Sequence, residues 1–362
     1  MSIFRSGLSR ATVAAVGLVV VASSAFVGAP AYASAASALP QNAASGSFGA
    51  VATAVADQVK PEVSRIAGAD RFASAVAASG AWAPGVDSLF IVNGVSYADA
   101  LSAGPAAAHQ NAPLLLVAPD SVPEVVMTEI KRLRPHKVII IGGENAVSRS
   151  VGSRIGREAA VATVERYSGA DRFRTSQEVA SYIWRDTLAT EAFLATGFNF
   201  PDALSAGAAG AALDAPVILV DPRQPADYPL TATLNGLGVE SVLAVGGQNA
   251  VPDAFLDSVD EKVNGEVYRI SGDDRFQTSA AIADAVFEQT DIAYLAVGTN
   301  FPDALAGTAL AGKTASPLFT VRQNCIPAVV NDALVSHGVR RVVLLGGENA
   351  LSRDVEALTV CA

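Results

Sequence analysis

Acidic residues paired with arginine recur in one fixed setting along this sequence. The pattern Gly-x-Asp-Arg-Phe occurs three times, with the pairs Asp70-Arg71, Asp171-Arg172 and Asp274-Arg275. A guanidinium group offers planar, bidentate hydrogen-bond donors that fit a carboxylate or a phosphate. The pairs therefore indicate either ion-pair bridges between neighbouring parts of the fold or exposed contacts with an anionic ligand. The sequence alone favours neither interpretation.

A second set of acids follows an aromatic residue. Asn-Phe-Pro-Asp-Ala-Leu occurs at Asn199–Leu204 and Asn300–Leu305, and the first copy has Tyr97 two residues before Asp99. These acids are Asp99, Asp202 and Asp303. Each is expected to open a helix, where a carboxylate accepts hydrogen bonds from the first turn. Capping is the favoured role, and ligand contact is the alternative. The aromatic residue is expected to be buried between copies, with stacking on a sugar as the alternative.

The other reactive residues form no recognisable catalytic set. His109, His136 and His337 lack metal-like spacing and are expected at the surface or at helix ends. Cofactors are therefore not expected, except for a divalent cation that could bridge the acids to an anionic ligand. Cys325 and Cys361 are the only cysteines. Two cysteines favour a disulfide over a metal site, because a metal needs more ligands.

The elements that position these motifs follow from a repeat. Gly-Gly-x-Asn-Ala begins at Gly142, Gly246 and Gly346, and the order and spacing of all three motifs recur. The repeats are placed at residues 63–160, 161–264 and 265–362. The first should contain strands at Val63–Ile66, Leu89–Val92, Leu114–Val117 and Lys137–Ile141 and helices at Ala73–Ser79, Asp99–Gln110 and Pro123–Leu133. Continuous Val, Ile and Leu runs predict parallel strands covered on both faces, and hence an α/β fold.

Charge and hydropathy exclude several classes of protein. The 362 residues are 51% hydrophobic and 17% charged, which excludes a disordered chain. The net charge is −10 and no run of basic residues occurs, so nucleic acid is not an expected partner. Residues 1–33 resemble a signal peptide, with a retained membrane anchor as the alternative, and residues 34–62 form an Ala/Ser-rich spacer. Nothing later has the length and apolarity of a membrane span, so an exported protein is expected.

The ordered motifs resemble those of the cell wall-binding repeat 2 family over residues 63–362. The resemblance implies three tandem repeats, each an open, mainly parallel sheet flanked by helices, packed as a pseudo-threefold trimer within one chain. It also implies non-covalent attachment to anionic wall polymers, either teichoic acid or secondary wall polysaccharide. The family's Pro-Ile-Leu-Leu strand, linked to polymer binding, matches Pro113–Leu116 and Pro216–Leu219. The third copy departs from it at Pro317–Thr320.

The expected protein is therefore a secreted, monomeric, non-catalytic binder of the bacterial cell wall. The candidate ligand-binding residues are Asp70, Arg71, Asp99, Asp171, Arg172, Asn199, Asp202, Asp274, Arg275, Asn300 and Asp303. A glycan hydrolase that uses the motif carboxylates is one alternative, although catalysis usually needs one asymmetric constellation and these acids are triplicated. A secreted protein-binding scaffold is another. Loss of residues 1–33, which hold two arginines and no acid, changes the net charge from −10 to −12.

Overall fold

The computed structural model describes residues 60–97 and 99–362. The predicted signal peptide and most of the predicted spacer lie outside these residues. The first strand begins at Glu62, which the sequence had placed in the spacer. Among the described residues, no helix is both long enough and apolar enough to cross a membrane.

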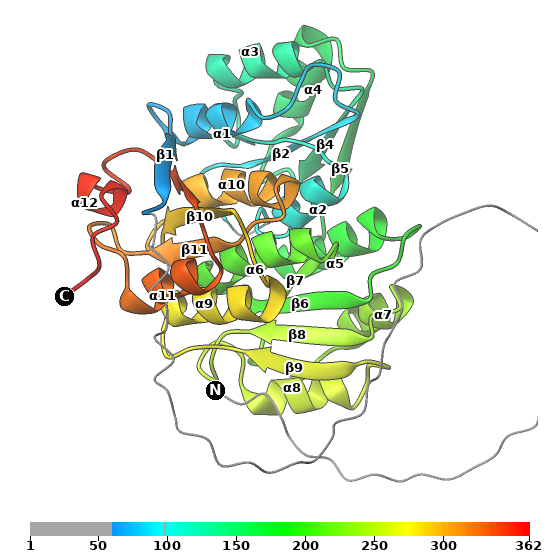
Figure 1. Cartoon of the computed structure of the whole chain (residues 1–362). Coiled ribbons are helices and arrows are strands. Elements are labelled where there is room, and N and C mark those ends of the chain that lie inside the picture. Colours follow the sequence, from blue (N-terminus) through cyan, green and yellow to red (C-terminus); the bar gives the residue numbers. More distant parts are fainter. Residues whose placement is uncertain (1–59, 98) are drawn as a thin grey trace, which may run out of the picture. The chain divides into compact units, whose positions relative to one another are not determined.

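Strands and helices alternate through all three repeats (Figure 1). The first repeat contains β1 (Glu62–Ile66), α1 (Arg71–Ser79), β2 (Ser88–Asn93), α2 (Ala103–His109), β3 (Leu114–Val117), α3 (Glu124–Leu133), β4 (Lys137–Ile141) and α4 (Arg149–Glu158). The second contains β5 (Thr163–Tyr167), α5 (Arg172–Ile183), β6 (Glu191–Thr196), α6 (Pro201–Ala212), β7 (Val217–Val220), α7 (Tyr228–Gly236), β8 (Ser241–Val245) and α8 (Asp253–Asp260). The third contains β9 (Glu266–Ile270), α9 (Arg275–Val286), β10 (Ile292–Val297), α10 (Pro302–Lys313), β11 (Leu318–Val321), α11 (Ala328–Ser336), β12 (Arg341–Leu345) and α12 (Arg353–Glu356).

Three parallel four-stranded sheets form the body, and each borrows a strand from another repeat. The strand orders are β3-β2-β4-β5, β7-β6-β8-β9 and β11-β10-β12-β1. The strand that opens a repeat thus completes the sheet of the preceding one, and β1 returns to β12 of the last repeat. The sheets therefore bridge the repeat divisions drawn from the sequence. They close the chain into a ring, because every opening strand finds its hydrogen-bonding edge on a neighbour.

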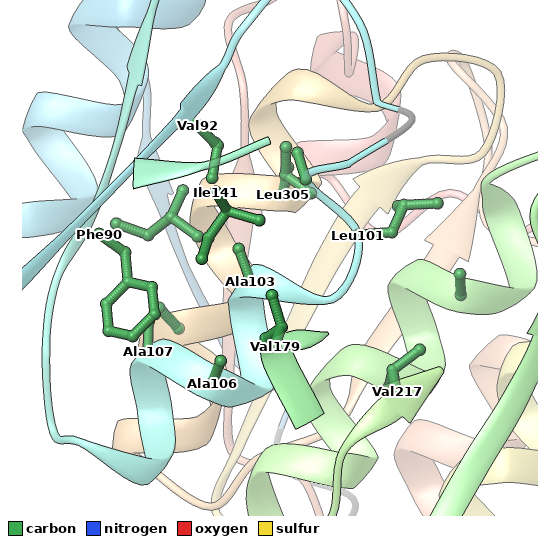
Figure 2. Close-up of a cluster of buried hydrophobic side chains, with 14 of the residues drawn as sticks. Phe90, Val92, Leu101, Ala103, Ala106, Ala107, Ile141, Val179, Val217 and Leu305 are labelled. Atoms are coloured by element: carbon green, nitrogen blue, oxygen red, sulfur yellow. The ribbon is translucent and has the colours of Figure 1, made fainter. Parts of the chain in front are cut away.

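The strands carry the apolar core that their sequences predicted. β2, β3 and β7 are buried along their whole length. Figure 2 shows side chains from all three repeats in one cluster, including Phe90, Val217 and Leu305. The Leu and Ile side chains of the two Pro-Ile-Leu-Leu matches are also buried, and they therefore serve the core of each sheet.

Helices α2, α6 and α10 pack against one another at the centre of the repeats. Small residues allow this close approach. A Cβ added to Gly104 would lie 2.1 Å from Oγ1 of Thr308, and one added to Gly312 would lie 2.5 Å from the Cβ atoms of Ala108 and Ala211. Because each layer takes one residue from each repeat, the three repeats pack as a pseudo-threefold trimer within one chain.

The aromatic residue of the second motif also lies at this centre. The rings of Tyr97, Phe200 and Phe301 form a triangle with centroid separations of 5.5, 5.6 and 5.8 Å. All three residues are half-buried. They contact one another across the repeat boundaries, as expected for residues buried between copies.

The C-terminal segment is held to the third repeat by the predicted disulfide. Cys325 and Cys361 are bonded, with their Cα atoms 5.0 Å apart. The amide of Cys361 donates to the carbonyl of Ile326, whose own amide donates to Thr359. The disulfide and these two hydrogen bonds fix the last residues beside the loop that precedes α11.

Candidate functional site

The acids of the Gly-x-Asp-Arg-Phe motif are helix caps. The Asp70 carboxylate accepts hydrogen bonds from the amides of Phe72 and Ala73 at 2.9 and 2.8 Å. Asp171 and Asp274 cap α5 and α9 in the same way. Each has an extended backbone just before the first helical turn, the conformation in which a side chain reaches the free amides of that turn.

Each arginine of the same motif is held by a hydrogen bond from one of its two terminal nitrogens. The Nη1 atom of Arg71 donates to the carbonyl of Gly94 at 2.7 Å, and Arg172 and Arg275 donate to Gly197 and Gly298 at 2.7 and 2.5 Å. Within the described residues, none of the three arginines forms an ion pair. Each guanidinium is therefore held in place by the main chain and keeps donors available for another group.

The acids of the second motif do not have the capping role expected from the sequence. Asp202 and Asp303 are the second residues of α6 and α10, and Phe200 and Phe301 occupy the capping positions. Asp99 precedes α2, whose capping position is Ser102. The proline before Asp202 and Asp303 begins each helix, because its fixed φ and missing amide suit the first turn.

These second-motif carboxylates instead face the glycine pair of their own repeat. A Cβ added to Gly142, Gly246 or Gly346 would lie 2.5–2.8 Å from the Oδ2 atom of the corresponding acid. The same glycines have φ values of 108°, 104° and 108°, which L side chains rarely adopt. The first glycine of each pair thus leaves room for the acid.

Each second-motif acid also faces the first motif of the next repeat. Burial raises the pKa of the Asp99 carboxyl, against the opposing effects of the Thr175 hydroxyl and the charge of Arg172. Burial likewise raises the pKa of Asp202, and the charge of Arg275 opposes it. The third repeat completes the cycle, since the pKa of Asp303 is raised by burial and lowered by Ser74 and Arg71 of the first repeat.

A groove of about 590 Å³ between the second and third repeats brings the three motifs together. Its walls include Asn199 and Asp202 from the second repeat and Asp274 and Arg275 from the third. The Gly-Gly-x-Asn-Ala loop supplies Gly247, Gln248, Asn249 and Ala250. Asn300, the counterpart of Asn199, is exposed and accepts a hydrogen bond from the amide of Phe301. The groove thus offers carboxylate and amide acceptors beside guanidinium donors.

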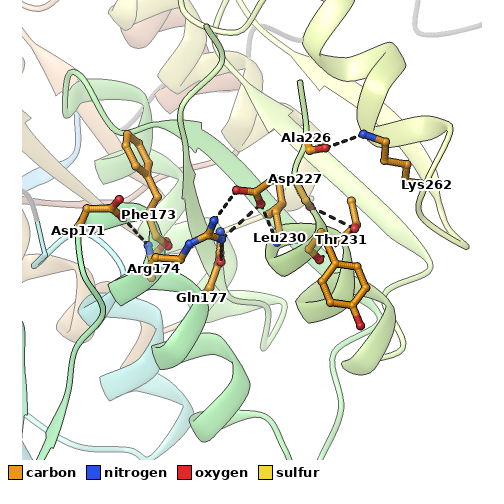
Figure 3. Close-up of polar contacts among 11 residues, drawn as sticks. Asp171, Phe173, Arg174, Gln177, Ala226, Asp227, Leu230, Thr231 and Lys262 are labelled. Atoms are coloured by element: carbon orange, nitrogen blue, oxygen red, sulfur yellow. Dashed lines mark hydrogen bonds and ion pairs between the residues drawn. The ribbon is translucent and has the colours of Figure 1, made fainter. Parts of the chain in front are cut away.

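The second repeat holds a smaller cavity, of about 220 Å³, at the end of β7. Figure 3 shows Arg174 between Gln177 and Asp227, and its Nη2 atom lies 2.5 Å from Oδ2 of Asp227. Asp171 lines this cavity. Motif comparison missed the cavity, because Ala73 and Gln277 occupy the place of Arg174 in the other repeats.

The groove combines the hydrogen-bond acceptors and donors of a binding site. Within residues 60–97 and 99–362, no group of three or more His, Cys, Asp and Glu residues is placed to hold a metal ion. Sugar hydroxyls can donate to the carboxylates and side-chain amides, and an acidic group can accept from the arginines. The fold and the groove together define a triplicated α/β binding module.

The comparisons with known proteins agree with that class. The sequence pattern of Cell wall binding domain 2 (CWB2) matches three times, at residues 65–152, 166–256 and 269–356. The chain belongs to this family and is a cell wall-binding protein. N-acetylmuramoyl-L-alanine amidase LytC of Bacillus subtilis (strain 168) is 27% identical over 84% of this chain and 59% of its own length. The Amidase enhancer of the same organism is 28% identical over 81% of this chain and 39% of its own length.

Two solved structures have the same fold. Cwp6 from Clostridium difficile matches 83% of this chain with a TM-score of 0.75 and 26% identity. Cwp8 from the same organism matches 83% with a TM-score of 0.74 and 28% identity. The chain spans 48% and 51% of those proteins and roughly half the length of the curated relatives.

Proposed function

We propose that this protein is exported and attaches non-covalently to an anionic cell wall polymer, teichoic acid or secondary wall polysaccharide, without catalysing a reaction. The observation that carries the proposal is the recurring arrangement of a partly buried Asp facing an arginine of the next repeat. In the groove between the second and third repeats these are Asp202 and Arg275. The candidate ligand-binding residues are the motif residues of this groove and their counterparts in the other repeats.

The relatives support a wall-associated role. LytC is named as an amidase, and the second relative as an enhancer of an amidase. The chain spans 59% and 39% of their lengths, so we do not carry their activities over to it. The shared part is the binding module, and we assign this chain only attachment.

Local groups must hold an anionic polymer against the net charge of the chain. The chain carries 25 basic and 35 acidic residues, which repels a polyanion at long range. Arginines fixed in grooves act at short range, where the ion pair is less screened. Three such contacts on one polymer would raise its avidity by ~10²–10⁴ over a single contact when all are engaged together.

Co-sedimentation with purified walls tests the proposal. The protein is expected to sediment with intact walls and to remain in solution with walls stripped of phosphate and acidic polymers. Undiminished binding to stripped peptidoglycan would refute polymer attachment. A parallel series with a chelator separates direct contact from bridging by divalent cations, since bridging alone is lost in the chelator.

Two further readouts address the other classes. A zymogram with wall substrate should show no clearing, and clearing that disappears in Asp202→Asn would favour a hydrolase. Sedimentation of the protein alone should give a monomer, whereas a larger species would favour a protein-binding scaffold.

A further inference from the structure

Three equivalent arginines lie on the borrowed strands β1, β5 and β9. They are Arg65, Arg166 and Arg269, each one residue before the end of its strand. The Nη1 atom of each donates to the carbonyl of the first glycine of a Gly-Gly pair, at 2.8, 2.6 and 2.7 Å respectively. The main chain thus places all three guanidinium groups in the same way.

Two of these arginines have a carboxylate partner from the helix that follows the glycine pair. The Nη2 atom of Arg269 lies 2.7 Å from Oδ1 of Asp253, and that of Arg65 lies 3.1 Å from Oε2 of Glu356. Within the described residues, Arg166 forms no ion pair. In α4 the place of Asp253 is taken by Arg149 and the place of Glu356 by Gly152, so neither acid has a counterpart beside Arg166.

The surroundings of Arg166 are electropositive as a result. Burial lowers the pKa of Arg166, and the charge of Arg149 lowers it further, against the opposing charge of Glu144. Glu144 is itself ion-paired with Arg149. Eight basic residues and only three acids lie between residues 131 and 166, although the whole chain has a net charge of −10.

The space in front of Arg166 is hollow. A groove of about 580 Å³ lies between α4 and the edge strand β5, and Arg149, Gly152, Gly156 and Arg157 line it together with Arg166. In the second repeat, α8 and the residue that follows it hold Leu256, Asp260 and Glu261 in place of Gly152, Gly156 and Arg157. The side chains that line the groove in the first repeat are therefore smaller and less acidic than their counterparts in the second repeat.

The only acid that lines this groove is already engaged. Glu165 accepts a hydrogen bond from the Tyr167 hydroxyl at 2.7 Å and lies 3.5 Å from the Nζ atom of Lys137. Arg157 has no ion-pair partner among the described residues. Two arginines thus remain available to an acidic group that enters from solvent.

We propose that this arginine groove, formed by Arg149, Arg157 and Arg166, is an additional anion-binding site. A phosphate or carboxylate group of the wall polymer takes the place that Asp253 and Glu356 hold in the other sheets. The assignment to a wall polymer rests on the function proposed above, whereas anion binding does not. The site exists in the first repeat alone, because it depends on residues that differ between the repeats.

The test is a substitution that gives Arg166 a carboxylate partner from the protein itself. Arg149→Asp places at α4 the acid that α8 has, so Arg166 gains an internal partner and the groove loses a cation. Arg353→Asp on α12 is a matched control. The side chains of Arg149 and Arg353 are 82% and 81% exposed, and each is paired with a glutamate five residues earlier. Arg157→Gln, which removes no ion pair, is a second groove variant.

Titration calorimetry with short-chain polyphosphate and, separately, with polygalacturonate measures the effect. The unmodified protein and Arg353→Asp are expected to bind at least one probe, and the probe bound distinguishes phosphate from carboxylate. The affinity of Arg149→Asp for the probe should be lower by a factor of about ten or more, the factor that one charge-assisted hydrogen bond contributes. Arg157→Gln should weaken binding in the same direction. Thermal melting verifies that all variants fold.

Equal affinities of Arg149→Asp and Arg353→Asp for the probe would overturn the proposal. It would also be overturned if neither probe bound to the unmodified protein. Wall co-sedimentation keeps the two proposals separate. If the unmodified protein sediments with walls but the two variants bind the probes equally, attachment stands and the arginine groove is refuted. If the probes show the groove but walls do not bind, the anion site stands and wall attachment fails.

Discussion

The packing of α2, α6 and α10 predicts that one added methyl group at their contact destabilises the fold. At equivalent positions these helices carry Gly104, Gly207 and Thr308. In Gly104→Ala, the new Cβ would meet Thr308 at 2.1 Å from Oγ1 and 2.7 Å from Cβ. The Thr308 side chain is 2% exposed and its hydroxyl donates to the carbonyl of Leu305, so it has no free space to move into.

Two opposing effects set the magnitude. Replacing glycine by alanine within a helix stabilises the folded state by about 0.5–1 kcal/mol through the entropy of the unfolded chain. Overpacking a filled core costs about 1–3 kcal/mol, and a rigid β-branched partner favours the upper part of that range. Gly104→Ala is therefore expected to lower the free energy of unfolding by about 1–2 kcal/mol.

A double-mutant cycle with Thr308→Gly separates these effects. Without the Thr308 side chain, the three atoms nearest the new Cβ are gone. In that background Gly104→Ala should stabilise the protein, so the sign of its effect reverses. Urea unfolding of the four proteins measures both effects. An equal loss of stability in both backgrounds would refute the close packing of α2 against α10.

Three further predictions concern charge, covalent linkage and the smaller cavity. Asp202→Asn should stabilise the protein at neutral pH, because burial raises the pKa of the Asp202 carboxyl in the folded state above 3.8. This gain in stability should vanish as the pH falls toward 3.8, where the carboxyl is increasingly protonated in both states. Urea titrations at several pH values measure the gain, and a gain that does not change with pH would contradict the raised pKa. Cys361→Ser opens a bridge to Cys325 that spans 36 residues and should cost about 4 kcal/mol by loop-closure entropy, and a reductant should then have no additional effect. Arg174→Gln breaks the ion pair with Asp227, whose side chain is 51% exposed, and should cost under about 1 kcal/mol in a melting comparison; a larger loss would mean that this pair organises the cavity.

Much of the fold could be predicted because it repeats. The apolar run Leu114–Val117 became a strand with those ends, and Lys137–Ile141 did too. The partner of a strand is not written in its own residues, since any parallel edge offers the same hydrogen bonds. Sequence patterns therefore did not show that β1 completes the sheet of the third repeat.

The site was predicted in composition but not in geometry. Asp70 and Asp202 both lie at the start of a helix, and the backbone conformation decides which one is the cap. Pro201 held a usable signal, because a proline favours the first helical position and places Asp202 one residue inside. Asp202 and Arg275 come from different repeats, and they lie opposite each other because of the way in which the repeats pack. The spacing of residues within one repeat cannot reveal that packing.

Features that differ between repeats escaped detection for a related reason. Comparison of copies selects what they share, whereas Arg174 and Arg149 each occupy a position where another repeat has a different residue. Their importance appears only when equivalent positions are superposed in space and a missing partner becomes visible, as it does for Arg166.

The most direct measurement is a wall-binding titration of a variant in which the arginines of the three Gly-x-Asp-Arg-Phe motifs are changed together. The substitutions are Arg71→Gln, Arg172→Gln and Arg275→Gln. A control with the same change in charge alters three arginines that are 62%, 77% and 81% exposed, by Arg185→Gln, Arg340→Gln and Arg353→Gln. If the inter-repeat grooves hold the wall polymer, the groove variant should lose ~10²-fold or more in affinity while the control keeps it. Equal wall affinity of the two folded variants would contradict binding at these grooves.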